Sequence, residues 1–127
     1  MVRCALLALA LSASLAPFVV HAQVQRNFPA NALRGEVSMT DPPDIAVNGR
    51  PARLAPGARL RGQDNMIVVS GALQGQRFVA HYTLDTLGLV KDVWVLRKEE
   101  AIGLWPRTPA EAAAWRFDPA AQAWTKP

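Results

Sequence analysis

Short runs of alternating polar and apolar residues fill the stretch from Gly35 to Arg97. A period of two, typical of half-buried strands, is clearest at residues 36–40 and 77–84. Asn48-Gly49 predicts a hairpin between two further runs, because both residues tolerate the positive φ of a type I′ turn. Other short strands are predicted at residues 45–47, 50–54, 58–61, 66–69 and 89–96. Residues 35–97 are therefore predicted to form a mainly β domain, a small antiparallel barrel or rolled sheet of SH3-like or OB-like size.

Two of these runs also carry expectations about burial. Alternation in the run 77–84 places Phe78 and Tyr82 on one face and His81 on the other, so His81 is expected to face solvent or the rim of the barrel. Met66–Val69 is a continuous apolar run rich in β-branched residues, which predicts a strand buried on both faces.

The last thirty or so residues follow a different pattern. Thr108-Pro109-Ala110-Glu111 has the order of a helix start, with an N-cap, a proline in the first turn and a glutamate three residues after the cap, so a short helix to about Trp115 is expected. Beyond it, residues 115–117 and 123–125 are predicted to pair as a hairpin, with a second helical turn as the alternative. Residues 98–127 are thus expected to form a short helix and a Trp-rich tail that packs on the barrel, and residues 23–34 an extended lead-in.

The amino terminus has the layout of a secretory signal peptide. Arg3 precedes an apolar run over residues 5–20, and the small residue Ala22 offers a cleavage site. The run is shorter than the ~20 residues of a membrane span and Pro17 interrupts it, so no permanent membrane anchor is expected. Residues 1–22 are predicted to be removed, with Cys4 among them.

Composition and charge narrow the classes of protein further. The 127 residues suit one domain, and a chain that is 50% hydrophobic with a net charge of +4 is not disordered throughout. Loss of Arg3 with the leader reduces the 14 basic residues to 13 against 10 acidic ones, a mildly basic balance. Export and this small charge excess argue against a nucleic-acid partner. Residues 23–127 contain no cysteine, so packing or a partner, rather than disulfides, must stabilise the fold.

The chemistry available to residues 23–127 is limited. His81 is their single histidine, and an extended backbone places it roughly 13 Å from Asp85 at ~3.3 Å per residue, too far for a catalytic pair. One histidine without cysteine cannot form a zinc site, and the aspartates occur at turns without a calcium-loop pattern. No phosphate-binding glycine motif is present. No metal and no cofactor are therefore expected.

Two groups of residues are candidates for binding. The first is a set of arginines in the stretch between Asp44 and Asp64, which contains no acidic residue: Arg50, Arg53, Arg59 and Arg61. If they share one face they could attract an anion. The alternative is that they form a solvated strand edge, where their charges prevent aggregation. The second is a set of tryptophans late in the chain, suited to a partner surface or else to covering a small barrel core: Trp105, Trp115 and Trp124.

Three segments carry a family resemblance: RNFPANALRGE (26–36), NGRPARLAPGARLR (48–61) and DTLGLVKDVW (85–94). In these segments the chain resembles a group of small exported proteins of Gram-negative proteobacteria, and the resemblance covers most of residues 23–127. It implies a periplasmic or secreted setting, in agreement with the leader, and it implies no activity or site.

The features together predict an exported protein that acts as a non-catalytic binding or structural module of the bacterial cell envelope. Its expected partner is an anionic envelope component or a periplasmic protein. The alternative is a small periplasmic hydrolase that uses His81 with a nearby carboxylate.

Overall fold

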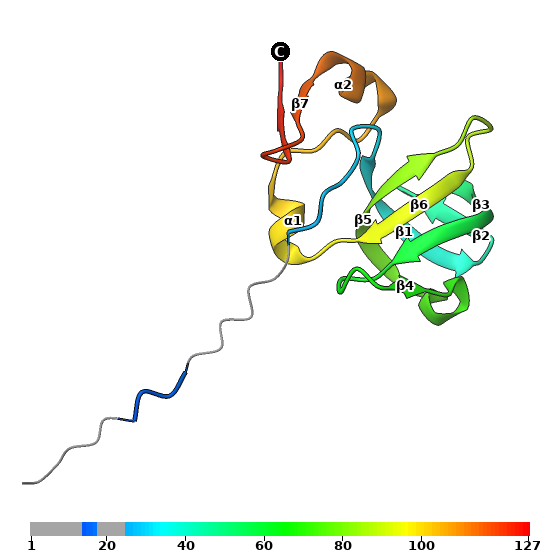
Figure 1. Ribbon diagram of the computed structural model, residues 1–127. Helices are drawn as coiled ribbons and strands as arrows, with labels where there is room; N and C mark the ends of the chain where they lie inside the picture. The colour runs from blue at the N-terminus through cyan, green and yellow to red at the C-terminus, as the bar shows by residue number, and fades with distance from the viewer. Residues whose placement is uncertain (1–13, 18–24) are drawn as a thin grey trace, which may run out of the picture.

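The computed structural model describes residues 14–17 and 25–127. Most of the predicted signal peptide, its cleavage site included, lies outside these residues. Figure 1 shows a twisted barrel on one side of the molecule, with the C-terminal segment beside it and the lead-in running between the two. Within the described residues, no helix has the length and apolar character needed to cross a membrane.

The barrel confirms the predicted fold class: it is mainly β, small and closed by five strands. Its strands close in the order β1-β2-β3-β6-β5 and back to β1; β3 and β6 are parallel and the other neighbours antiparallel. This Greek-key order is that of an OB-type barrel rather than an SH3-like one. The strands are β1 (Leu33–Asp41), β2 (Asp44–Val47), β3 (Arg50–Arg61), β5 (Arg77–Leu84) and β6 (Val90–Val95).

The β2–β3 turn has the hairpin structure that its local sequence predicts. Asn48 and Gly49 both have positive φ, 53° and 78°, and Val47 pairs with Arg50 across the turn, which confirms the hairpin. β1 begins at Leu33, two residues before the predicted start of the domain. The predicted strands 50–54 and 58–61 form one strand, β3, with an irregular pairing around Gly57, whose φ is 74°.

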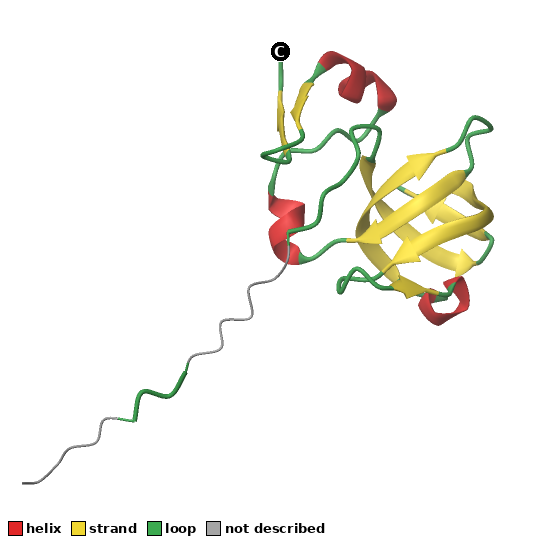
Figure 2. Cartoon of the chain, in the orientation of Figure 1, coloured by secondary structure: helices red, strands yellow, loops and turns green. Residues whose placement is uncertain are grey.

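The interior of the barrel holds the main hydrophobic core. Alternation along each strand turns one set of side chains inward, as the period of two predicts. Figure 2 shows how the strands wrap around this interior. The buried members are Leu33, Val37, Met39, Ile45, Leu54, Leu60, Ala80, Tyr82, Val90 and Val93.

The prediction of a strand buried on both faces at Met66–Val69 is wrong. Only β4 (Ile67–Val68) is a strand; it pairs with β3 at one end of the sheet order and no described strand pairs with its other side. A short 3-10 helix, η1 (Ser70–Leu73), then turns the chain. Ile67 and Val69 are consequently 66% and 74% exposed, and only Val68 packs toward the core.

The C-terminal segment contains two short helices and a hairpin. In α2 (Pro109–Ala114), the Thr108 hydroxyl accepts a hydrogen bond from the Glu111 backbone N–H at 3.1 Å, so the predicted helix start is confirmed. The hairpin β7 (Arg116–Asp118) and β8 (Ala123–Thr125) confirms the preferred prediction for this region. The first helix, α1 (Lys98–Ile102), has no specific counterpart among the predicted elements.

A second hydrophobic cluster joins the lead-in, the outer face of the barrel and the C-terminal segment. We call the region of this cluster the seam. Its buried members come from the lead-in, from β6 and the residue after it, and from the C-terminal segment: Phe28 and Ala32, Trp94 and Leu96, and Trp105 and Trp124. The tail therefore packs against the barrel.

Candidate functional site

A row of outward-facing side chains crosses four barrel strands beneath the seam. Arg61 on β3 pairs with Trp94 on β6, Trp94 pairs with His81 on β5, and His81 pairs with Arg34 on β1. Directly paired residues on neighbouring strands point to the same face of a sheet. The strand register therefore places two guanidinium groups, an indole and an imidazole side by side on the outside of the barrel.

His81 lies on the predicted face, but the expectation that it faces solvent is wrong, because its side chain is only 1% exposed. The Trp105 ring stacks on it with centroids 4.2 Å apart, and the Phe28 ring meets it edge-on at 4.4 Å. Both covering residues come from outside the barrel strands. The lead-in and the C-terminal segment thus turn an outer face into an interior one.

The hydrogen bonds of His81 define its protonation state. Arg34 Nε donates to His81 Nε2 at 3.3 Å, so the single proton of the neutral ring sits on Nδ1, and Nδ1 has no hydrogen-bond partner in the described part of the chain. The pKa of His81 is lowered to about 3, chiefly by burial and also by the charges of Arg34 and Arg26, while the charge of Glu100 opposes them. The imidazole is therefore neutral at neutral pH and presents an unpaired N–H.

Arg34 fastens β1 to the end of α1. Its Nη1 donates to the carbonyl oxygens of Ala101, at 3.1 Å, and of Gly103, and its Nη2 donates to that of Glu100 at 2.9 Å. Its side chain is buried, and burial followed by the nearby charge of Arg107 lowers its pKa. Every acceptor of this guanidinium among the described residues is neutral.

A second buried arginine, Arg26, does have a carboxylate partner. Its guanidinium makes two hydrogen bonds to Glu100, at 2.9 and 2.5 Å, and it also donates to the carbonyls of Gly62 and Val95. Burial raises the pKa of Glu100, but hydrogen bonds from Arg26 and Arg97 outweigh it and lower the pKa to about 2. Glu100 is therefore ionised and shared between two arginines.

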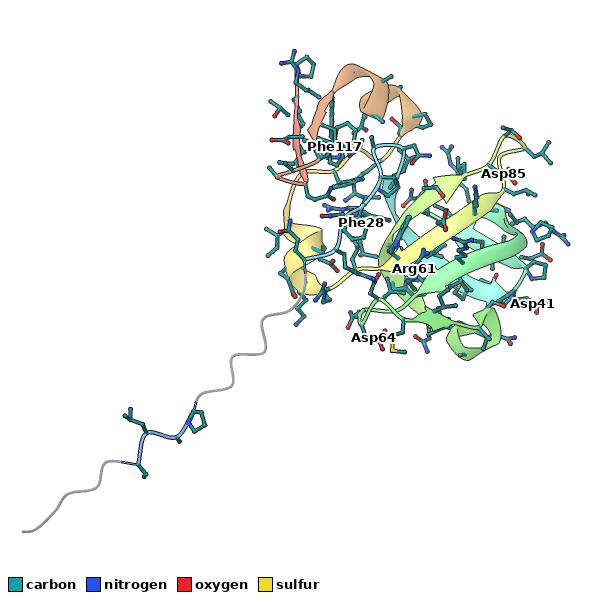
Figure 3. The ribbon with its side chains drawn as sticks, viewed as in Figure 1. Phe28, Asp41, Arg61, Asp64, Asp85 and Phe117 are labelled. Atoms are coloured by element: carbon teal, nitrogen blue, oxygen red, sulfur yellow. The ribbon has the colours of Figure 1, made fainter. Side chains whose placement is uncertain are left out.

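A pocket of about 330 Å³ opens at the seam, and we call it the seam pocket. Buried side chains form its floor and exposed residues its mouth. In the view of Figure 3, Phe28 lies between Phe117 of the C-terminal hairpin and Arg61 of the barrel. The floor includes Arg26, Phe28, Arg34, His81 and Trp105, and the mouth includes Gln25, Glu99, Gly103 and Leu104.

The four candidate arginines of β3 do not form one patch. Arg50 lies at the hairpin end of the strand, and Arg59 is exposed near the other end. Arg53 forms an exposed ion pair with Asp44 at 3.4 Å. Arg61 pairs with Asp92 at 3.5 Å and lies 5.4 Å from the centre of the Trp94 ring. This dispersal favours the alternative of a solvated strand.

The three candidate tryptophans lie together in the C-terminal segment, but two of them are not on the surface. Trp105 and Trp124 are buried, with ring centroids 5.8 Å apart, and Trp105 Nε1 donates to the Ala32 carbonyl at 2.9 Å. Trp115 is half-buried, and the ammonium group of Lys126 lies 5.4 Å from its ring centre. The burial of Trp105 and Trp124 fits the alternative in which the tail covers the barrel.

The surroundings of His81 suit acid–base catalysis poorly. A general base works best with a pKa near the operating pH, and a pKa of about 3 is far below neutrality. The nearby carboxylate, Glu100, is held by Arg26 and Arg97, while Asp85 accepts hydrogen bonds from the backbone of its own turn. Among the described residues, no group of three or more His, Cys, Asp or Glu side chains is placed to hold a metal ion.

Among the residues of this site that sequence reasoning missed are Arg26, Arg34 and Glu100. A usable signal was present in the lead-in, where Arg26 and Arg34 flank an aromatic residue, Phe28, in a segment without acidic residues. Their partners lie so far along the chain that only the strand register and the path of the tail bring them together.

Comparison with protein-family models, with curated proteins and with solved structures found no match for this chain. The resemblance to small exported proteobacterial proteins therefore stays a prediction.

Proposed function

We propose that this protein is a non-catalytic binding module of the bacterial cell envelope and that the seam pocket holds its ligand. The observation that carries the proposal is the floor of this pocket. There a buried guanidinium, Arg34, lies beside a buried imidazole, His81, whose Nδ1–H has no partner among the described residues. A polar group left unpaired inside a protein is costly unless a ligand or water pairs with it, and His81 is one of the residues that line the pocket, so the unpaired group favours a binding role.

The chemistry of the floor supports binding rather than turnover. The neutral His81 can donate from Nδ1, but its low pKa makes it a weak base at neutral pH. Residues 25–127 include no cysteine to act as a nucleophile. The cationic and aromatic side chains of the pocket are the types that orient a ligand.

A variant that blocks the pocket tests the proposal. Gly103 lies at the mouth, and a Cβ built on it meets nothing within 4 Å, so Gly103→Phe adds bulk there without a clash at the backbone. Gly71, on η1 and outside the pocket, is equally open and provides the matched control Gly71→Phe. Small molecules from a periplasmic extract should raise the Tm of the wild type and of Gly71→Phe, and should leave the Tm of Gly103→Phe unchanged. Equal shifts in all three proteins would place binding elsewhere.

Location in the envelope is a separate part of the proposal, supported by the leader pattern of residues 1–22. Mass spectrometry of the protein from a periplasmic or secreted fraction should find a chain that begins at Gln23. Recovery of the uncleaved chain from the cytosol alone would contradict this part, and it would leave the test of the pocket intact.

A further inference from the structure

The charges around the seam pocket do not balance. Three guanidinium groups line it, those of Arg26, Arg34 and Arg97, against two carboxylates, those of Glu99 and Glu100. Arg26 and Arg97 share Glu100, and Glu99 lies 3.9 Å from Arg97. Since His81 is neutral, the lining carries a net single positive charge, and it is Arg34 that has no carboxylate partner in the described part of the chain.

Arg34 is a buried cation whose hydrogen-bond acceptors among the described residues are all neutral, and the nearby charge of Arg107 has the same sign. Carbonyl oxygens solvate its charge without cancelling it, and a buried charge without a counter-ion lowers stability. Four of its five N–H groups are used by the hydrogen bonds to His81 and to the end of α1, which leaves one on Nη2. The floor therefore offers donors and positive charge together.

From this floor we infer that the ligand of the seam pocket is a small organic carboxylate, whose charge balances that of Arg34 and which accepts a hydrogen bond from His81 Nδ1. The inference rests on the proposed function and names the chemical class of its ligand. A carboxylate carries one negative charge, which matches the single excess positive charge of the lining, whereas a phosphate dianion would exceed it.

The remaining walls indicate the shape of the ligand. Phe28, Leu104 and Trp105 give the pocket an apolar side, so the carboxylate is expected to carry an apolar body. A volume of about 330 Å³ is at the low end of the range for small-molecule sites, about 300–1,000 Å³. The pocket therefore suits a small acid and not a polymer chain threaded through the fold.

Benzoate and benzamide form a matched pair of probes, because they share an aromatic body and differ in charge. Calorimetric titration of the purified protein should show benzoate binding at least about tenfold more tightly than benzamide, since a charge-assisted contact replaces a neutral one. Benzoate should bind Gly71→Phe as it binds the wild type, and should not bind Gly103→Phe. Inorganic phosphate is expected to bind more weakly than benzoate. In nuclear magnetic resonance spectra, the Nδ1 signal of His81 should shift with benzoate.

The outcomes separate this inference from the function on which it rests. Benzamide binding as tightly as benzoate, tighter binding of phosphate, or an unmoved His81 signal would overturn the carboxylate and leave a ligand pocket in place. Absence of benzoate binding to the wild type would also overturn the inference, while the Tm test with periplasmic extract would still decide the proposed function. Undiminished benzoate binding by Gly103→Phe would remove the seam pocket as the site and contradict both.

Discussion

His81 shows how burial changes what a single side chain contributes. Its ring is enclosed by Phe28 and Trp105, and the neighbouring Arg34 adds a positive charge that disfavours protonation. The same residue on an uncovered barrel face would titrate near its ordinary pKa of 6.5. In this fold the imidazole is neutral, and protonating it in the folded state costs free energy. The free energy of unfolding must therefore depend on pH.

The stability of the protein should therefore fall as the pH drops below 6.5. The folded pKa of His81 is about 3, so below pH 6.5 the unfolded chain binds a proton that the folded chain does not, and this favours unfolding. The free energy of unfolding should decrease by about 1 kcal/mol for each pH unit between about pH 6 and pH 5. Urea denaturation at a series of pH values measures this slope.

Two features isolate His81 in that experiment. Glu100, whose folded pKa of about 2 is also depressed, adds its own loss of stability only below its ordinary value of 4.5. His81→Gln, which has no titrating group, should be less stable but flat between about pH 6.5 and pH 5. A wild type with a flat profile, or a variant with the same slope, would show that His81 is not buried in its neutral form.

Even the conservative substitution of Arg34 by lysine is expected to destabilise the protein. Lysine keeps the charge but cannot reproduce the planar fork that reaches three carbonyl oxygens and His81. Arg34→Lys should lower the free energy of unfolding by about 2 kcal/mol, because several part-buried carbonyls lose their donors at once. Arg59→Lys, at an exposed arginine of β3, should change it by no more than about 0.5 kcal/mol. Equal effects in denaturant titrations would contradict the structural role of Arg34.

At the scale of elements, the β7–β8 hairpin derives its stability from packing rather than from length. Its strands have three residues each, and Phe117 and Trp124 pair across them with stacked rings 4.8 Å apart. An isolated two-stranded hairpin is marginal in water. Contact with Trp105, whose ring meets both Phe117 and Trp124, fixes the hairpin on the seam.

Truncation of the buried tryptophan of this hairpin should be much more damaging than truncation of its half-buried neighbour. Trp124→Ala removes a ring from the second core and should cost about 3 kcal/mol or more. Trp115→Ala removes a ring that is partly in contact with solvent and Lys126, and about 1 kcal/mol is expected. Thermal and chemical denaturation of the two variants compare them directly, and equal losses would contradict the burial of Trp124 in the seam.

Elements with a local chemical signal were predictable from the sequence, and elements defined by long-range contacts were not. Asn48-Gly49 specified its hairpin, and Thr108-Pro109 with Glu111 specified the start of α2, because turn and cap geometry depend on adjacent residues. Hydrophobicity alone gave the wrong prediction of burial for the run around Ile67, because apolar residues in a strand at the end of a sheet have the same sequence pattern as those in a central strand.

On the scale of the whole molecule, the site arises where distant segments meet. Arg26 and Glu100 are 74 positions apart, and Arg34 and His81 are 47 apart. The alternation of β5 predicted the correct face for His81. Whether that face is exposed to solvent depends on whether the lead-in and the tail cover it. Neither path has a periodic pattern, and this is why the sequence predicted the barrel but not the pocket against it.

The two hydrophobic cores should unfold together. Trp94 belongs to a barrel strand but is buried in the second core, so loss of the seam would expose apolar surface on the barrel. Hydrogen bonds from Arg34 and Arg26 also connect the barrel and the lead-in to α1. Two cores linked in this way are expected to unfold in one cooperative transition. Tryptophan fluorescence reports mainly on the seam, and Tyr82, the single tyrosine, reports on the barrel core. Denaturation followed by tryptophan emission, by the ring signals of Tyr82 and by far-ultraviolet circular dichroism should give one midpoint. A tryptophan transition at lower denaturant than that of Tyr82 would instead mean that the tail can leave a folded barrel, with the seam pocket lost before the fold.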